Sequence, residues 1–284
     1  MSIFGIRTLH RLNQVLSSQV SKRTFNWCLT SRSRSQPLTQ GHNPWPLEGS
    51  RQMATASSSD GIVPQDFNYF LVLDFEATCL RQQRISPQEI IEFPVLKVNG
   101  ENFETEATFH TYVQPTVHGV SEFCTELTGI TQEMVNGQPT LQETLTTFQE
   151  WMDSQGLLVP ECKSVFVTCG DWDLKTMLPT QCQHFSLKIP TYFNQWINIK
   201  KAYAAVTGYF PKGMMPMLHH LDIEHEGKHH SGIDDCKNIA KILSAIASRG
   251  YKFTITGNIN QYNQSKVKVS RGSRHGRAYN DSNT

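Results

Sequence analysis

The chain has 284 residues, of which 38% are hydrophobic, and its formal net charge at pH 7 is +1. That length accommodates one domain of about 200 residues with flanking segments, and the hydrophobic content is enough for a sizeable core. Because no apolar run approaches the roughly 18 residues of a membrane-spanning helix, we expect a soluble protein with no membrane partner.

Charge is unevenly distributed along the chain. Six arginines and lysines precede the first acidic residue, Glu48, and five lie beyond residue 258, where Asp281 is the one acid. The seven cysteines show no C-x-x-C spacing and are odd in number. This pattern favours reduced thiols in the cytosol, nucleus or mitochondria, and it argues against a disulfide framework or a zinc ribbon.

Residues 1–60 are predicted to lie outside the globular domain. Residues 3–20 interleave apolar side chains with Arg, His and Ser, contain no acid, and are followed by a Ser/Arg-rich stretch. Such a segment is typical of a mitochondrial presequence. The alternatives are a disordered tail or an upstream extension that is absent when translation starts at Met53. In either case the protein would be cytoplasmic or nuclear.

From residue 61 the pattern becomes that of a folded domain. Apolar runs predict strands at 69–76, 90–98 and 103–113, with a turn at 98–101, as in an antiparallel meander. Helical spacing and turn signals predict later helices at 121–127, 139–152, near 195–205 and at 232–249. A further strand is predicted at 164–168, and it runs into Gly170 and another helix. Strands first and helices later indicate an α/β fold, a mixed sheet flanked by helices.

Two acids at the end of the first predicted strand are the first candidate site. Asp74 and Glu76 are two residues apart, so a strand directs both side chains to the same side. Such close like charges are tolerated when a hard cation lies between them, and carboxylate oxygens suit Mg²⁺ or Mn²⁺. The alternative is a strand end at which both acids reach water.

Further acids lie at two predicted helix starts. After Gly170, Asp171 fits the position of a helix cap, which leaves Asp173 one turn inside the helix. Ser231 and Asp234 fit a capping box, which leaves Asp235. Each aspartate taken singly is better explained as a capping or surface residue.

Histidines crowd the segment before the last helix, at positions 219, 220, 225, 229 and 230. We do not interpret them as a zinc site, because the nearest cysteine is Cys236 and paired ligand spacings are missing. A loop around residues 213–217 is expected to shape access to the site.

Taken together, D-x-E after a first strand, a distant Asp at a strand-to-helix turn and H-x4-D opening the last helix resemble the DEDDh exonucleases of the ribonuclease H-like superfamily. The resemblance covers residues 67–254. The local sequence is similar to the enhanced-RNAi / histone-mRNA 3′-exonuclease group, and in particular to its small, prion-protein-interacting branch without a SAP domain. The segments that carry this likeness are Phe70–Cys79, Pro87–Pro94, Leu127–Ile130, Trp196–Lys201 and Gly232–Ala240.

The resemblance implies a role for each candidate residue. Asp74, Glu76, Asp173 and Asp235 would bind two Mg²⁺ ions about 3.5 to 4 Å apart, with Mn²⁺ as a possible substitute. His230 would act as the general base beside the catalytic Glu76, with a pKa near the ordinary value of about 6.5. The neighbouring His229 is expected to face solvent without a partner.

Substrate contacts follow from the same resemblance. Phe75, Ala77 and Thr78 would lie near the 3′-terminal sugar, Leu127 and Thr128 against its base, and Trp172 would stack on the base or form a wall, with His230 also touching substrate. Stacking is tolerant of base identity, so trimming would be too. Core packing is the alternative role for Trp172 and Leu127.

These observations predict a Mg²⁺-dependent 3′-to-5′ exoribonuclease that releases 5′-mononucleotides from single-stranded RNA or 3′ overhangs. The alternatives are an exonuclease acting on DNA and a noncatalytic RNA-binding adaptor on the same fold. The expected partner is RNA with a free 3′ end, and DNA is the alternative. We expect the exonuclease domain at 61–257 and a basic disordered tail at 258–284, which either follows RNA phosphates from Lys266 to Arg277 or is inert.

Overall fold

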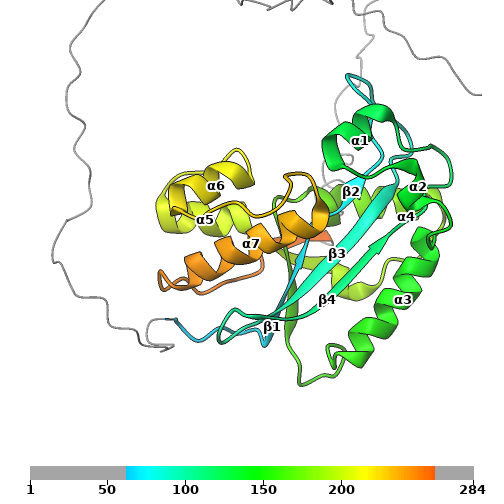
Figure 1. The fold of residues 1–284 in the computed structure, drawn as a ribbon. Coiled ribbons are helices and arrows are strands. Elements are labelled where there is room, and N and C mark those ends of the chain that lie inside the picture. The colour runs from blue at the N-terminus through cyan, green and yellow to red at the C-terminus, as the bar shows by residue number, and fades with distance from the viewer. Residues whose placement is uncertain (1–61, 260–284) are drawn as a thin grey trace, which may run out of the picture. The chain divides into compact units, whose positions relative to one another are not determined.

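A computed structural model describes residues 62–259, in which seven strands form one mixed sheet in the order β2-β3-β1-β5-β6-β7, with β4 on β3 (Figure 1). The strands are β1 (Tyr69–Leu73), β2 (Glu76–Ala77), β3 (Ile90–Asn99), β4 (Thr105–Tyr112), β5 (Ser164–Thr168), β6 (Gln195–Asn198) and β7 (Gly257–Asn258). Strand β3 pairs antiparallel with β1 and with β4, which confirms the predicted meander. Strand β5 pairs parallel with both β1 and β6.

The first predicted strand, 69–76, is wrong in one respect, because it is interrupted at Asp74 and Phe75. Leu73 pairs with Val95 and Glu76 with Glu92, so the same register would place Pro94 opposite Asp74. Proline has no N–H to donate to a strand ladder. The backbone of Asp74 and Phe75 is therefore left to make other contacts.

Helices cover both faces of the sheet (Figure 1). Phe70 and Val72 of β1 pack in one core with α5 (Ile199–Thr207), α6 (Met214–Leu221) and α7 (Gly232–Ala247). Leu71 and Leu73 point to the opposite face and pack against α3 (Leu141–Ser154) and α4 (Leu178–His184). This alternation determines which face of the sheet Asp74 and Glu76 share.

The remaining helical elements are α1 (Glu122–Thr128), α2 (Gln132–Val135), a π-helical turn (Asp173–Met177) and a 3₁₀ turn (Thr191–Asn194). Two expectations are wrong here. The helix expected near 195–205 is strand β6 up to Asn198, whose side chain then caps α5 by accepting from the Lys200 amide. The expected loop at 213–217 is largely the first turn of α6.

No helix within residues 62–259 is long and apolar enough to cross a membrane. The expectations for the presequence-like segment, for Met53 as a start and for the basic tail from Lys266 to Arg277 concern residues outside this range.

Candidate active site

Asp74 and Glu76 lie on the α7 side of the sheet, because their neighbours Leu73, Phe75 and Ala77 face the other core. The amide of Phe75, free of strand pairing, donates to Asp173 Oδ1 at 3.0 Å. The break in the first strand thus connects the D-x-E segment to an aspartate 98 residues further along the chain.

Asp173 is the first residue of the π-helical turn and is buried. Asp171 does not cap this turn, contrary to expectation. Its carboxylate instead accepts hydrogen bonds from Trp196, Asn198 and Lys201. Burial alone would raise the pKa of Asp171, but these hydrogen bonds hold it below the ordinary value. Asp171 therefore anchors β6 and α5, and Asp173 is the residue that reaches the site.

The start of α7 is capped from another strand. The buried Glu92 of β3 accepts from the amides of Gly232 (2.9 Å) and Ile233 (3.1 Å). The predicted capping box is wrong, since the Ser231 side chain makes no capping bond and Asp234 accepts from the Lys228 amide and from Lys237. A carboxylate at these amides neutralises the helix N-terminus and fixes α7 to the sheet.

Asp235, in the first turn of α7, is bonded to the histidine turn that precedes the helix. Its Oδ2 accepts from the His230 amide at 2.9 Å and lies 3.2 Å from His229 Nδ1. The ring of His229 stacks on that of His230 with centroids 4.0 Å apart. The expectation that His229 has no partner is therefore wrong, although its side chain is exposed.

The four acids and His230 line a single cleft of about 440 Å³. Carboxylate oxygens of Asp74, Glu76 and Asp235 lie within 4.8 Å of one another. The structure therefore brings together residues from the break after β1, from β2, from the π-helical turn, and from α7 and the turn before it.

Burial raises the pKa values of all four acids, and repulsion by neighbouring carboxylates raises those of Asp74 and Glu76 further. Burial, then Glu92, Asp235 and Asp173, raise the pKa of Glu76 to about 9. Burial raises that of Asp173 to about 6, opposed by the Phe75 hydrogen bond. The pKa of Asp74 is also well above its ordinary value, through burial and then through Asp173 and Glu76.

Such a donor set fits hard divalent cations. Four clustered carboxylates need nearby positive charge to be ionised together, and their all-oxygen chemistry suits Mg²⁺ or Mn²⁺. The fold and the acids together imply that the site uses a divalent metal ion.

His230 adopts a left-handed backbone conformation (φ 68°), and its side chain lines the cleft beside the acids. Burial, then the neighbouring His229, lower the pKa of His230 below its ordinary value. The expectation of an ordinary pKa was thus too high. The lowered pKa favours the neutral ring, which can accept a proton.

The predicted substrate residues divide into two groups. Phe75, Ala77, Leu127 and Trp172 line the cleft, and Trp172 is 41% exposed, so it is not a core residue. The Phe75 ring itself packs on Phe93, with centroids 4.7 Å apart.

Thr78 and Thr128 are buried and do not line the cleft. The Thr78 hydroxyl accepts from the Glu89 amide, and the Thr128 hydroxyl donates to the Cys124 carbonyl. Both hydroxyls thus bond the protein's own backbone, and the predicted substrate contacts of these two side chains gain no support from this geometry.

Sequence reasoning missed Glu92 and Lys200. A charged residue within the otherwise apolar run 90–96 was the available signal for Glu92, whereas nothing in the sequence marked Lys200 as a cleft residue. Of the five clustered histidines, only His229 and His230 belong to a group of three or more side chains in the described range that could share a metal ion. His220 instead bonds Tyr203.

A mixed sheet covered by helices, with four acids and a histidine converging on one cleft, defines a DEDDh nuclease of the ribonuclease H-like class. Residues 71–243 match the RNase_T family, described as Exonuclease. The chain belongs to this exonuclease family.

Curated relatives and solved structures agree with this assignment. The chain is 60% identical over 195 residues to ERI1 exoribonuclease 3 of Homo sapiens. The aligned region covers 68% of this chain and 58% of the human protein. It is 36% identical to the 3′-5′ exonuclease Snipper of Drosophila melanogaster, covering 72% of this chain and 79% of the relative. The match thus spans little more than half the length of the human relative.

Among solved structures, the nuclease domain of 3′hExo, described as a DEDDh family member bound to rAMP, superposes with a TM-score of 0.66 at 35% identity. It covers 69% of this chain and all of the other. A 3′-exonuclease structure that concerns recognition of the histone mRNA stem-loop gives a TM-score of 0.66 at 33% identity, covering 72% of this chain and 70% of the other.

Proposed function

We propose that this chain is a Mg²⁺-dependent 3′-to-5′ exoribonuclease that releases 5′-mononucleotides from single-stranded RNA or short 3′ overhangs. The observation that carries the proposal is the convergence of Asp74, Glu76, Asp173 and Asp235 with His230 in one cleft. An RNA-binding adaptor would have no use for four carboxylates that repel one another. Residues 61–257 are proposed as the exonuclease domain.

The four acids would hold the metal ions, and bound ions would activate a water and stabilise the leaving 3′ oxygen. His230 would take the proton of the attacking water through its neutral ring. Asp235 holds the His230 backbone by accepting its amide, and it thereby fixes the position of the base relative to the acids. General-base catalysis contributes roughly 10²–10⁴-fold to rate.

The cleft also offers a place for the last nucleotide. Leu127 of α1 and Trp172, just before the π-helical turn, both line it, and neither provides a hydrogen-bonding edge specific to one base. We expect them to contact the terminal base on its faces, so that trimming tolerates any sequence. The preference for RNA rests on the relatives named exoribonucleases.

The test uses RNA and DNA of matched sequence, each labelled at the 5′ end, incubated with Mg²⁺ or a chelator. The parent chain should shorten the RNA from its 3′ end in single-nucleotide steps with Mg²⁺ alone. The His230→Ala variant should be slower by roughly 10²-fold or more. His219→Ala, on the exposed surface of α6, is the matched histidine control.

Endonucleolytic fragments, or shortening that persists with the chelator, would overturn the proposal. Equal or faster shortening of the DNA would replace RNA by DNA as the substrate while leaving the metal-dependent chemistry in place. Tight RNA binding without any hydrolysis would favour the adaptor.

A further inference from the structure

One wall of the cleft belongs to a segment without acids. Residues 199–221, comprising α5, the loop 208–213 and α6, contain Lys200, Lys201 and Lys212 but no Asp or Glu. Lys201 is paired with Asp171, whereas Lys212 is exposed. Because this segment has lysines and no acidic side chains, it attracts a negatively charged polymer along its length.

The same segment carries most of the exposed aromatic surface in the described part of the chain. Nine large hydrophobic side chains are exposed within residues 62–259, and the aromatic ones among them are Trp172, Tyr209 and Phe210. Tyr209 is 53% and Phe210 58% exposed, and Met215 follows at 39%. Two adjacent exposed rings without a partner suggest a ligand with flat faces.

The loop that carries these rings is held in place by its own contacts. Gly208 ends α5 in a left-handed conformation (φ 73°), and the Tyr209 amide donates to the Thr207 hydroxyl. At the other end of the loop, Lys200 Nζ donates to the Lys212 carbonyl at 3.1 Å. Pro211, which lies between Phe210 and Lys212 in the sequence, is buried. The rings therefore point outward from an anchored loop.

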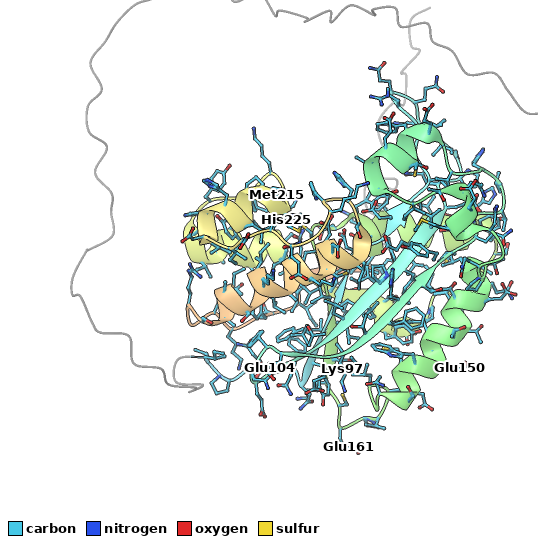
Figure 2. All side chains as sticks on the ribbon, in the orientation of Figure 1. Lys97, Glu104, Glu150, Glu161, Met215 and His225 are labelled. Carbon is cyan, nitrogen blue, oxygen red and sulfur yellow. The ribbon has the colours of Figure 1, made fainter. Side chains whose placement is uncertain are left out.

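This surface is continuous with the cleft. Lys200 and residues 213–216 line the cleft together with Trp172. Phe210 is three residues from Gly213, so it lies within about 11 Å of the lining. Figure 2 shows Met215 on α6, the helix beside α7, whose first turn contributes Asp235.

We propose that Lys200, Tyr209, Phe210, Lys212 and Met215 form an upstream track, which binds the nucleotides on the 5′ side of the 3′-terminal nucleotide. The inference rests on the proposed function and names the part of the substrate that the acids do not touch. The rings stack on successive bases while the two lysines approach the phosphates. A single strand offers unpaired bases and closely spaced negative charge together, whereas a neutral peptide would leave the lysines without a role.

The experiment measures substrate length and chemistry separately. A small ester, the p-nitrophenyl ester of uridine 5′-monophosphate, reports Mg²⁺-dependent cleavage without any upstream nucleotide. Fluorescence anisotropy in the presence of chelator reports the binding of a labelled mononucleotide, which has no upstream nucleotide, and of a labelled decanucleotide. The variants are Tyr209→Ala with Phe210→Ala, Lys212→Ala, and a control, Val117→Ala with Val159→Ala, which removes exposed apolar surface at other loops.

We expect the aromatic double variant to bind the decanucleotide at least about 10-fold more weakly than the parent. Its mononucleotide affinity and ester cleavage should match those of the parent, which also shows that it is folded. Lys212→Ala should reduce the slope of log K against log salt for the decanucleotide by about 0.7. The control should behave as the parent in every assay.

Parent-like decanucleotide affinity in the aromatic double variant would overturn the upstream track. Equal losses for the mononucleotide and the decanucleotide would also overturn it, since the rings would then act at the terminal site. If the parent cleaves neither the ester nor RNA with Mg²⁺, the proposed function fails instead, so the two failures are distinguishable.

Discussion

Trp172 tests, at the residue scale, whether the cleft wall binds substrate. Its ring is exposed, so Trp172→Ala should change the free energy of unfolding little. Loss of one stacked base should raise the Kd for RNA by about 5- to 150-fold, since stacking contributes about 1–3 kcal/mol. Trp172→Phe, which keeps a ring, should recover most of the affinity. Unchanged affinity in Trp172→Ala would remove this residue from the binding site.

Glu92 is the residue on which the position of α7 depends. It is 1% exposed and accepts two α7 amides, so Glu92→Ala leaves two buried donors unpaired. We expect a loss of about 3 kcal/mol in the free energy of unfolding, because hydrogen bonds to charged groups contribute about 1.5–3 kcal/mol each. Urea denaturation measures it, with the exposed Glu101→Ala as the control.

Residue by residue, the sequence predicted the acids well and their local partners poorly. The D-x-E spacing alone directs Asp74 and Glu76 to one side of the sheet, as observed, although the strand itself is interrupted at Asp74 and Phe75. Asp171 binds the indole N–H of Trp196, 25 residues further along the chain, instead of capping a helix. The residue preferences of helix caps are local and cannot predict a contact with so distant a residue. His229 was similarly misassigned because its partner, Asp235, lies across a turn.

At the scale of elements, the approach of α7 to β1 requires a glycine at position 232. A Cβ there would lie 2.7 Å from the Asp74 carbonyl oxygen and 3.0 Å from Pro94 Cγ. Gly232→Ala should therefore move the start of α7 and separate Asp235 from Asp74. We expect at least about a 10-fold weaker metal affinity by calorimetry, equivalent to 1.4 kcal/mol.

The control for this prediction is Lys241→Ala, a surface substitution on the same helix. An unchanged metal affinity in Gly232→Ala would mean that the helix start can shift without disturbing the acids.

Elements with a long, regular pattern were predicted closely, and so was the five-residue strand β5, expected at 164–168 and observed at Ser164–Thr168, whereas strand β6 was not predicted. Helix α3 was expected at 139–152 and lies at Leu141–Ser154, where its apolar positions face one core. Strand β6 has four residues, too few for periodicity to distinguish strand from helix, and its pairing with β5 decides the outcome. The break between β1 and β2 likewise depends on the proline in the facing strand.

For the whole molecule, the clustered acids couple stability to pH. Raised pKa values mean that the folded protein retains protons that the unfolded chain has released. This contribution to stability is full below the ordinary values, 3.8 for Asp and 4.5 for Glu, and is lost as pH rises through the folded value of about 9 for Glu76. Without divalent metal, stability should therefore fall as the pH is raised over this window.

Glu76→Gln tests this directly, because the amide cannot ionise. In chelator at pH near 8, the variant should be more stable than the parent by at least about 1.4 kcal/mol, the equivalent of one pKa unit. With saturating Mg²⁺ the order should reverse, because ions that bind only the folded parent stabilise it by mass action. Urea denaturation across pH, with and without Mg²⁺, measures both effects. A parent whose stability in chelator is independent of pH would show that the acids are not held together against their repulsion, and the case for a shared metal site would fail with it.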